Sequence, residues 1–97
     1  MTVHHATLCI PADHPSLPGH FPGNPVVPGV VLLDRVAAEV ERHWNRRIAA
    51  LPQAKFLSPL LPQQTAQLEI SEVTSNRLRF RIIRDAAPIA SGEVELT

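Results

Sequence analysis

One segment of the sequence, residues 29–44, has the pattern of a long helix, and it limits what the chain can fold into. It begins at a Pro28-Gly29 pair and continues as "VVLLDRVAAEV". The first two turns of this segment are apolar on nearly every side. Proline followed by a helix start is a common arrangement, and a helix that is apolar all round is buried inside a fold. We therefore expect the N-terminal end of this helix to lie deep in the molecule.

Strand patterns surround this helix. Residues 2–10 alternate with apolar or small side chains on both sides, which predicts a strand with little water on either face. A strand over about 48–57 follows the helix, and three alternating strands over 65–73, 77–84 and 89–96 predict an antiparallel meander with one wet face. Their predicted inward side chains are Ala66, Leu68, Ile70, Leu78, Phe80, Ile82, Ala90, Gly92, Val94 and Leu96.

The apolar face of such a sheet needs a cover, and the helix is the only candidate to provide it. We therefore expect an α+β fold in which an antiparallel β-sheet wraps around one long central helix. With 97 residues, the chain is expected to form a single domain over residues 1–97, small enough that further burial in an oligomer is reasonable.

Composition excludes several classes of protein. Nine Lys and Arg balance nine Asp and Glu, so nothing favours binding to nucleic acid. No segment approaches the ~20 apolar residues of a membrane span. The single cysteine, Cys9, fits a reducing compartment, so we expect a cytoplasmic location. The histidines His4, His5, His14 and His43 have no carboxylate or cysteine at metal-ligand spacing, so we expect no metal site.

His20 lies in a loop rich in proline and glycine, "LPGHFPGNPVVPG". Its prolines exclude a helix interior or a central strand and largely fix the backbone angles. Gly19 and Gly23 beside the histidine permit a close approach of substrate. On residue type alone, His20 is more often a hydrogen-bonded turn residue than a catalytic base.

Asp34 interrupts the most apolar part of the helix. If it is buried, loss of water favours the protonated carboxyl, which suits a general acid. About as often, such an aspartate reaches the surface at a helix edge or pairs with its neighbour Arg35. The free N–H groups of Gly29 and Val30 at the helix start can hold a developing oxyanion. A histidine base, a carboxyl acid and these donors together favour proton abstraction beside a carbonyl.

The stretch "GHFPGNPVVPGVVLLD" resembles the signature of the 3-hydroxyacyl-acyl-carrier-protein dehydratases, in which a loop histidine precedes a helix carboxylate by fourteen residues. The likeness continues through "QAKFLSPLLPQQTAQLEI" and spans roughly residues 8–96. The short form is most similar to the compact, ApeI-like dehydratases of aryl polyene and related lipid or polyketide pathways. The resemblance implies the hotdog fold, in agreement with the architecture expected from periodicity.

The resemblance also implies roles for individual residues. His20 would take the C2 proton, Asp34 would protonate the leaving hydroxyl, and Gly29 with Val30 would bind the thioester oxygen. The loop and acyl tunnel would be formed by Phe21, Pro22, Gly23, Pro28 and Val31, with Leu32 and Val36 also facing the acyl chain. Such dehydratases use no metal or organic cofactor, act on acyl carrier protein, and form homodimers or larger homo-oligomers whose sites join His20 of one subunit to Asp34 of the next.

Some residues depart from the family pattern and keep two other functions open. Aspartate replaces the commoner glutamate at position 34, Ala38 replaces a glutamine, and Arg35 replaces a small apolar residue. The resemblance also begins close to the loop, so we expect a short form without the family's usual N-terminal helix and first strand. A hotdog thioesterase would use Asp34 without His20. A non-catalytic subunit would bind acyl carrier protein or complete a dehydratase heterodimer.

Acyl carrier proteins are acidic, so their docking surface should be basic. One candidate is the group Arg42, Arg46, Arg47 and Lys55, and the other is the row Arg77, Arg79, Arg81 and Arg84. For the row, we favour a solvated strand face over a docking surface.

Overall fold

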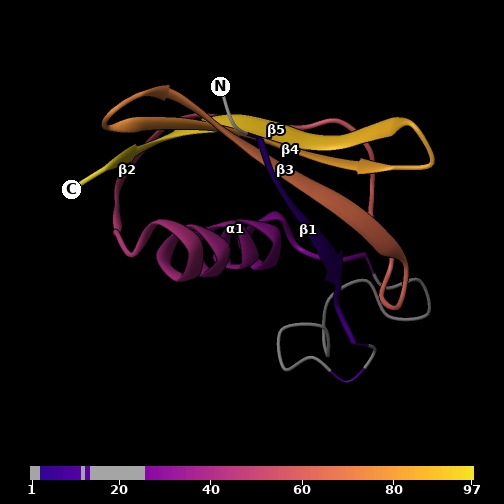
Figure 1. The fold of residues 1–97 in the computed structure, drawn as a ribbon. Helices are drawn as coiled ribbons and strands as arrows, with labels where there is room; N and C mark the ends of the chain where they lie inside the picture. Colours follow the sequence, from indigo (N-terminus) through magenta and orange to yellow (C-terminus); the bar gives the residue numbers. More distant parts are fainter. Residues whose placement is uncertain (1–2, 12, 14–25) are drawn as a thin grey trace.

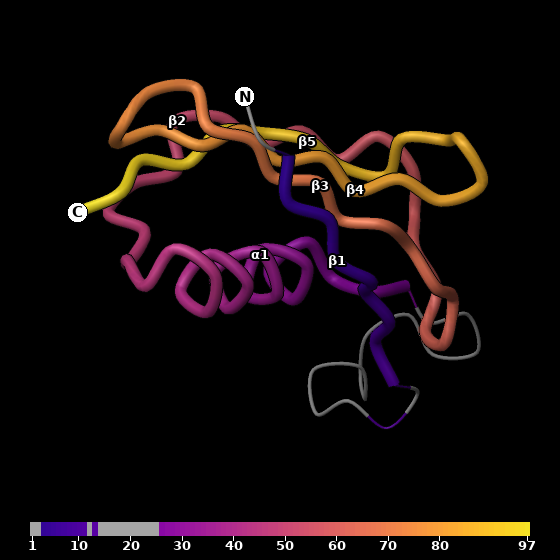
Figure 2. Tube along the Cα trace, viewed as in Figure 1, coloured from indigo at the N-terminus to yellow at the C-terminus, as the bar shows by residue number. Residues whose placement is uncertain are grey.

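The computed structural model describes residues 3–11, 13 and 26–97. Five antiparallel strands form one sheet, and a helix lies on one side of it (Figures 1 and 2). The order along the sheet is β1-β3-β4-β5-β2, so β1 and β2 are its two edges. The elements are β1 (Val3–Cys9), α1 (Gly29–Trp44), β2 (Ile48–Phe56), β3 (Thr65–Thr74), β4 (Arg77–Arg84) and β5 (Ala87–Leu96). The predicted sheet wrapped around one helix is confirmed, with strand ends displaced by one or two residues.

The helix α1 turns one stripe of side chains toward the sheet. Val31, Leu32, Val36 and Val40 are each at most 3% exposed, and their spacing places them on one helix face. The helix ends at Asn45, whose left-handed backbone lets its N–H donate to the Glu41 carbonyl at 2.9 Å. The helix thus has the bounds expected from the sequence.

The sheet supplies the other half of the core. All ten residues predicted to lie on the inner face of β3, β4 and β5 are buried, and Phe80 has the largest side chain among them. Gly92 is needed here because β2 approaches β5 closely: a Cβ atom on Gly92 would lie 2.2 Å from the Gln53 carbonyl oxygen. Alternating patterns therefore identified the inner face of the meander correctly.

Two expectations about burial were wrong, and both for the same reason. Val3, His5 and Thr7 of β1 are exposed, although the sequence predicted little water on either face. Val30, at the start of α1, is 62% exposed, although the helix start was expected to lie deep. One helix covers only one face of the sheet, and the sheet covers only one face of the helix. Among the residues that the structure describes, nothing covers the other apolar face of the helix at Val30 or the outer face of β1 at Val3.

Candidate functional site

An apolar groove of about 550 Å³ opens at the N-terminal end of α1. One wall is formed by residues 26–29, which lead into the helix, and the other by residues 56–60, which leave β2. Leu32 contributes from the first turn of the helix. Pro28 and Gly29, two of the residues predicted to form the site, therefore line a hollow that can take an apolar ligand.

The backbone donors of the helix start face no capping side chain. Pro28 occupies the position before the helix, and its carbonyl accepts hydrogen bonds from the N–H groups of Val31 at 3.0 Å and Leu32 at 3.4 Å. Within the part of the chain that the structure describes, no side chain caps the helix. The N–H groups of Gly29 and Val30 have no acceptor inside the helix, and no acceptor for them is found elsewhere among residues 3–11, 13 and 26–97. The helix dipole favours a negatively charged oxygen at this end.

Phe56, at the end of β2, packs directly on Gly29. A Cβ atom on Gly29 would lie 2.7 Å from Cζ of the Phe56 ring. A side chain at position 29 would therefore have to displace the Phe56 ring, whereas glycine lets the ring pack against the start of the helix. Sequence reasoning missed Phe56, because nothing in the local pattern connects the end of a strand with the start of a helix 27 positions earlier.

Asp34 is exposed in the single chain, so of the two alternatives, burial and a surface position, the structure has the second. It lies in a second hollow, of about 200 Å³, between α1 and β2, where Leu33, Ala37 and Leu51 are among its neighbours. The physical reason is that the sheet covers the opposite face of the helix. Of the two alternatives left open by the sequence, Asp34 reaches the surface at a helix edge.

Arg35 does not pair with Asp34. Its guanidinium donates to the Cys9 carbonyl at 2.8 Å, which ties the helix to the end of β1. No ion-pair partner of Asp34 occurs among the described residues. The carboxylate therefore faces an apolar hollow without a neutralising cation from residues 3–11, 13 or 26–97.

His20, Phe21, Pro22 and Gly23 lie outside the described residues, and their predicted roles remain predictions. The structure does show how the chain enters and leaves their segment. The Ile10 carbonyl accepts a hydrogen bond from the Gln63 N–H at 2.7 Å, and the Val27 N–H donates to the Leu60 carbonyl at 2.8 Å. Ile10, Val27 and Leu60 are all buried. Both ends are thus fixed on the connection between β2 and β3.

Val31 is buried between the helix and the sheet and lines neither hollow. Leu32 lines the groove at the helix start, and Val36 lines the hollow beside Asp34. Contact of these three side chains with an acyl chain stays a prediction. In the single chain, Leu32 and Val36 each line one of the two hollows, and Val31 lines neither.

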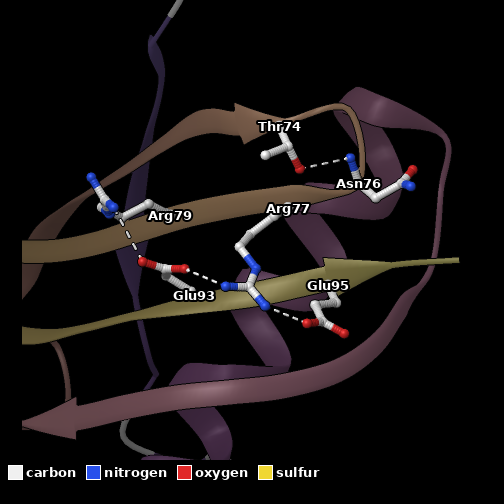
Figure 3. Close-up of polar contacts among 6 residues, drawn as sticks. All are labelled: Thr74, Asn76, Arg77, Arg79, Glu93 and Glu95. Carbon is white, nitrogen blue, oxygen red and sulfur yellow. Dashed lines mark hydrogen bonds and ion pairs between the residues drawn. The ribbon is translucent and has the colours of Figure 1, made fainter.

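The arginine row on the outer face of the sheet is neutralised by glutamates. Arg77 binds Glu95 and Glu93, and Arg79 also binds Glu93, at 3.1 Å (Figure 3). The hydrogen bond to Glu95 raises the pKa of Arg77. Arg81 pairs with Glu69 at 2.9 Å, and Arg84 lies 3.7 Å from Asp85. This arrangement supports the solvated strand face favoured for the row.

In the other basic group, two of the four cations are engaged within the chain. Arg42 pairs with Glu39, and its hydrogen bond lowers the pKa of that carboxyl. Arg46 donates to the carbonyls of Thr97 and Ser75 at the C-terminal side of the sheet. Among the described residues, Arg47 and Lys55 make no ion pair. These two cations remain for an acidic partner.

A polar cluster that the sequence did not reveal joins β1 to the end of α1. His4 Nε2 lies 2.5 Å from Glu39, the rings of His4 and His43 stack with centroids 3.8 Å apart, and Trp44 packs edge-on against both. Only the spacing of Glu39 and Arg42 signalled part of this cluster.

No group of three metal-binding side chains occurs among the residues with described positions. The one described helix is too short to span a membrane.

Two solved structures have this architecture. The dehydratase heterocomplex ApeI:P from Xenorhabdus doucetiae matches with a TM-score of 0.84 and 26% identity, over 97% of this chain and 86% of that one. An uncharacterized protein from Erwinia carotovora subsp. atroseptica matches with a TM-score of 0.80 and 24% identity, over the whole of this chain and 93% of the other. The fold is the hotdog fold, as the resemblance implied.

Sequence comparison gives the family. The chain matches the model of the ApeI-like dehydratases over residues 2–93. The 3-hydroxyacyl-acyl-carrier-protein dehydratase FabZ of Caulobacter sp. (strain K31) is 32% identical over 90% of this chain, and that of Pseudoalteromonas translucida (strain TAC 125) is 28% identical over 84%. The chain spans 61% and 62% of the lengths of these two relatives. It belongs to the ApeI-like dehydratase family.

Proposed function

We propose that this protein dehydrates 3-hydroxyacyl thioesters carried on acyl carrier protein to trans-2-enoyl thioesters, in fatty acid, aryl polyene or polyketide-type biosynthesis. One observation carries the proposal. The motif residues 28–34 run from an apolar groove, through the uncapped start of α1, to an exposed carboxylate. Apolar space for an acyl chain, donors for an oxyanion and an acid are the parts that this elimination needs.

Each group has one task in the reaction. The thioester oxygen accepts hydrogen bonds from the N–H groups of Gly29 and Val30, which makes the C2 proton more acidic. His20 takes that proton, and the electron pair of the C2–H bond forms the C2–C3 double bond as the C3–O bond breaks. Protonated Asp34 gives its proton to the departing hydroxyl, which leaves as water. The reaction balances as 3-hydroxyacyl thioester to 2-enoyl thioester plus water, without a cofactor.

A second subunit completes the site. Asp34 shares an open hollow with Leu33 and Leu51 beside the edge strand β2. Exposed apolar surface next to a carboxylate favours cover by another chain, which would also exclude water from the acid. A homodimer with His20 of one subunit near Asp34 of the other supplies that cover twice by symmetry. The acyl chain would lie between the subunits.

Acyl carrier protein is the proposed carrier of the substrate, because the curated relatives are dehydratases named for it. Arg47 and Lys55 are the cations of the first basic group that are left for its acidic surface. We propose a cytoplasmic location for this reaction, in keeping with the single cysteine of the sequence.

The test is turnover of 3-hydroxyacyl and trans-2-enoyl thioesters on acyl carrier protein, followed by mass spectrometry as loss or gain of water. We expect turnover by the wild type and none by His20→Ala or Asp34→Asn. If the site joins two subunits, co-expressed His20→Ala and Asp34→Asn chains regain about a quarter of wild-type activity, because half of the random dimers contain one intact site. Release of free acid that survives His20→Ala would instead show a thioesterase.

A hetero-oligomeric subunit is the second candidate. One of the similar solved structures is the dehydratase heterocomplex ApeI:P, and Arg35 and Ala38 depart from the dehydratase pattern. In this case the protein alone is inactive on every thioester, and activity requires a second hotdog chain from the same pathway. Light scattering of the purified protein, alone and with that chain, separates the two assemblies.

A further inference from the structure

The edge strand β1 lies beside α1 (Figure 1), and two contacts fix its direction. The Cys9 carbonyl accepts a hydrogen bond from Arg35 at 2.8 Å, and His4 Nε2 lies 2.5 Å from Glu39. The later residue of the strand thus contacts the earlier residue of the helix. The strand and the helix therefore run side by side in opposite directions.

Two carbonyls identify which backbone groups of β1 face away from the sheet. The Ile10 carbonyl accepts a hydrogen bond from the Gln63 N–H at 2.7 Å, on the side of β3, whereas the Cys9 carbonyl faces α1. In an antiparallel strand, the N–H and C=O of one residue point the same way, and those of the next residue point the opposite way. Thr7 and His5 therefore share the outward direction of Cys9. No partner for their backbone groups occurs in the described part of the chain.

The strand β1 also lacks the features that protect an edge strand from other chains. Its register with β3 is regular from Val3 to Cys9, and it contains no proline or lysine. The other edge, β2, contains Pro52 and Lys55 and has two register irregularities. Prolines, lysines and bulges are devices by which an edge strand avoids pairing with another chain. The edge of β1 is therefore the one at which a further strand can be added.

A hollow of about 230 Å³ lies along this edge, between residues 6–8 of β1 and one face of α1. Arg35, Ala38 and Arg42 line its helix side, and the buried Leu68 adds apolar surface. The small side chain of Ala38 leaves space between the two arginines. The hollow shares no lining residue with the groove at the start of α1 or with the hollow beside Asp34. It is thus a separate surface.

The free charge of this hollow is positive. Glu39, the acid among its described lining residues, is paired with Arg42 and His4. Arg35 makes no ion pair with any residue whose position is described, and its guanidinium donates to a neutral carbonyl. The charge of Arg35 therefore remains for an acidic group of a binding partner.

We propose that the hollow between β1 and α1 binds an extended, acidic segment of a partner protein, which adds a strand to the sheet at β1. The segment runs antiparallel to β1 and bonds to the outward N–H and C=O groups of Thr7 and His5. An acidic side chain faces Arg35. The side chain two positions later lies on the same face of the added strand and enters the hollow at Ala38. Backbone bonds supply the affinity, and these two side chains supply the selectivity.

The first experiment titrates the isotope-labelled protein with the synthetic heptapeptide Ser-Thr-Glu-Thr-Val-Thr-Ser, blocked at both ends, and follows the backbone amides by NMR. Its Glu and Val have the spacing of the two proposed side chains. We expect submillimolar binding, with large shifts and new protection from hydrogen exchange at the outward amides of His5 and Thr7. The inward amides of Ala6 and Leu8 should change less. Replacing Glu by Gln in the peptide should weaken binding about twofold to fivefold, as for an exposed ion pair.

Variants of the protein test the edge and the charge separately. Thr7→Pro removes an outward N–H at a position where an edge strand tolerates proline, and it should abolish binding. Thr7→Val keeps the N–H and is the matched control, with binding unchanged. Arg35→Gln should lose the preference for Glu over Gln in the peptide, whereas Arg79→Gln, which removes an arginine outside the hollow, should keep it. If Thr7→Pro does not fold, Ala38→Phe replaces it, because it fills the hollow from an exposed position of the helix.

The contrary results are equally specific. The inference is overturned by a peptide that does not bind at millimolar concentration, by equal binding to the wild type and Thr7→Pro, or by shifts that do not alternate along β1. Amides of His5 and Thr7 that are already protected in the protein alone would also overturn it, because another part of the chain or a second copy would then cover the edge. Light scattering of the wild type and Thr7→Pro distinguishes these two occupants.

Discussion

Replacing Gly92 by alanine should destabilise the sheet strongly. Gly92 pairs with Phe80 on β4 and with Ala54 on β2. A Cβ atom at this position would lie 2.2 Å from the Gln53 carbonyl oxygen and 2.8 Å from Cζ of Phe80. The first neighbour is backbone and cannot rotate away, so β2 has to move.

The size of the effect follows from these contacts. An ordinary C···O contact is about 3.3 Å, so β2 and β5 must separate locally by about 1 Å. Overpacking of this kind costs about 1–3 kcal/mol, and loss of one hydrogen bond between the strands adds about 1 kcal/mol. We therefore expect the free energy of unfolding to fall by about 2–4 kcal/mol. At a position with space, the same substitution would stabilise by about 0.4–1 kcal/mol, so even the sign depends on the contact.

Urea denaturation at one fixed protein concentration measures this change. The single tryptophan, Trp44, is partly buried and donates to Glu72 at 3.0 Å, so its fluorescence can report unfolding. We expect a lower midpoint with an unchanged slope. Ser91→Ala, at the neighbouring position on the other face of β5, is the control and should stay within about 0.5 kcal/mol of the wild type. A Gly92→Ala protein as stable as the wild type would refute the reasoning.

Three further substitutions test other parts of the structure. Arg46→Met should lower the free energy of unfolding by about 1–3 kcal/mol, because it removes charged hydrogen bonds to backbone carbonyls at the end of the sheet; urea denaturation measures it. Asp34→Asn should abolish dehydration in the mass-spectrometric assay and change stability by less than about 0.5 kcal/mol, since Asp34 is exposed and unpaired among the described residues. Glu39→Gln should reduce the loss of stability in acid: the hydrogen bond from Arg42 lowers the pKa of Glu39 below 4.5, so its stabilisation is present above that pH and is lost as pH falls through the lowered pKa.

Each of these three has a clear contrary result. Arg46→Met with wild-type stability would mean that the C-terminal side of the sheet does not depend on its bonds. Asp34→Asn with full activity would remove the acid from the proposed mechanism. For Glu39→Gln, the measurement is the urea midpoint between pH 3 and pH 7, and a curve parallel to that of the wild type would show that the contacts of Glu39 with Arg42 and His4 contribute nothing to the pH dependence.

The sequence predicted the fold well because periodicity reports burial inside one chain. The alternation of Leu78, Phe80 and Ile82 identified the inner face of β4, and the apolar run after Gly29 identified the helix with its bounds. The same reasoning failed for Val30, because apolar side chains on the second face of the helix are exposed in the single chain, and it left the burial of Asp34 undecided.

Part of the candidate site was predictable from the helix start and the family resemblance, and not from periodicity. Gly29 and Pro28 were expected from the helix start and the family resemblance, and the structure places both in the groove. Phe56 was not, because its contact with Gly29 depends on how the end of β2 passes the start of α1. The partners of the arginine row depend on strand register, which alternation alone does not determine.

The anchoring of the segment between Ile10 and Val27 has a consequence for how such proteins diversify. Its two ends are hydrogen-bonded to Gln63 and Leu60, residues three positions apart on the connection between β2 and β3, of which Leu60 is buried. Because both bonds join backbone atoms outside the part of the sequence that carries His20, substitutions within that part leave the bonding groups at its two ends unchanged. Relatives can therefore differ in the sequence around His20 and keep the same two anchor bonds.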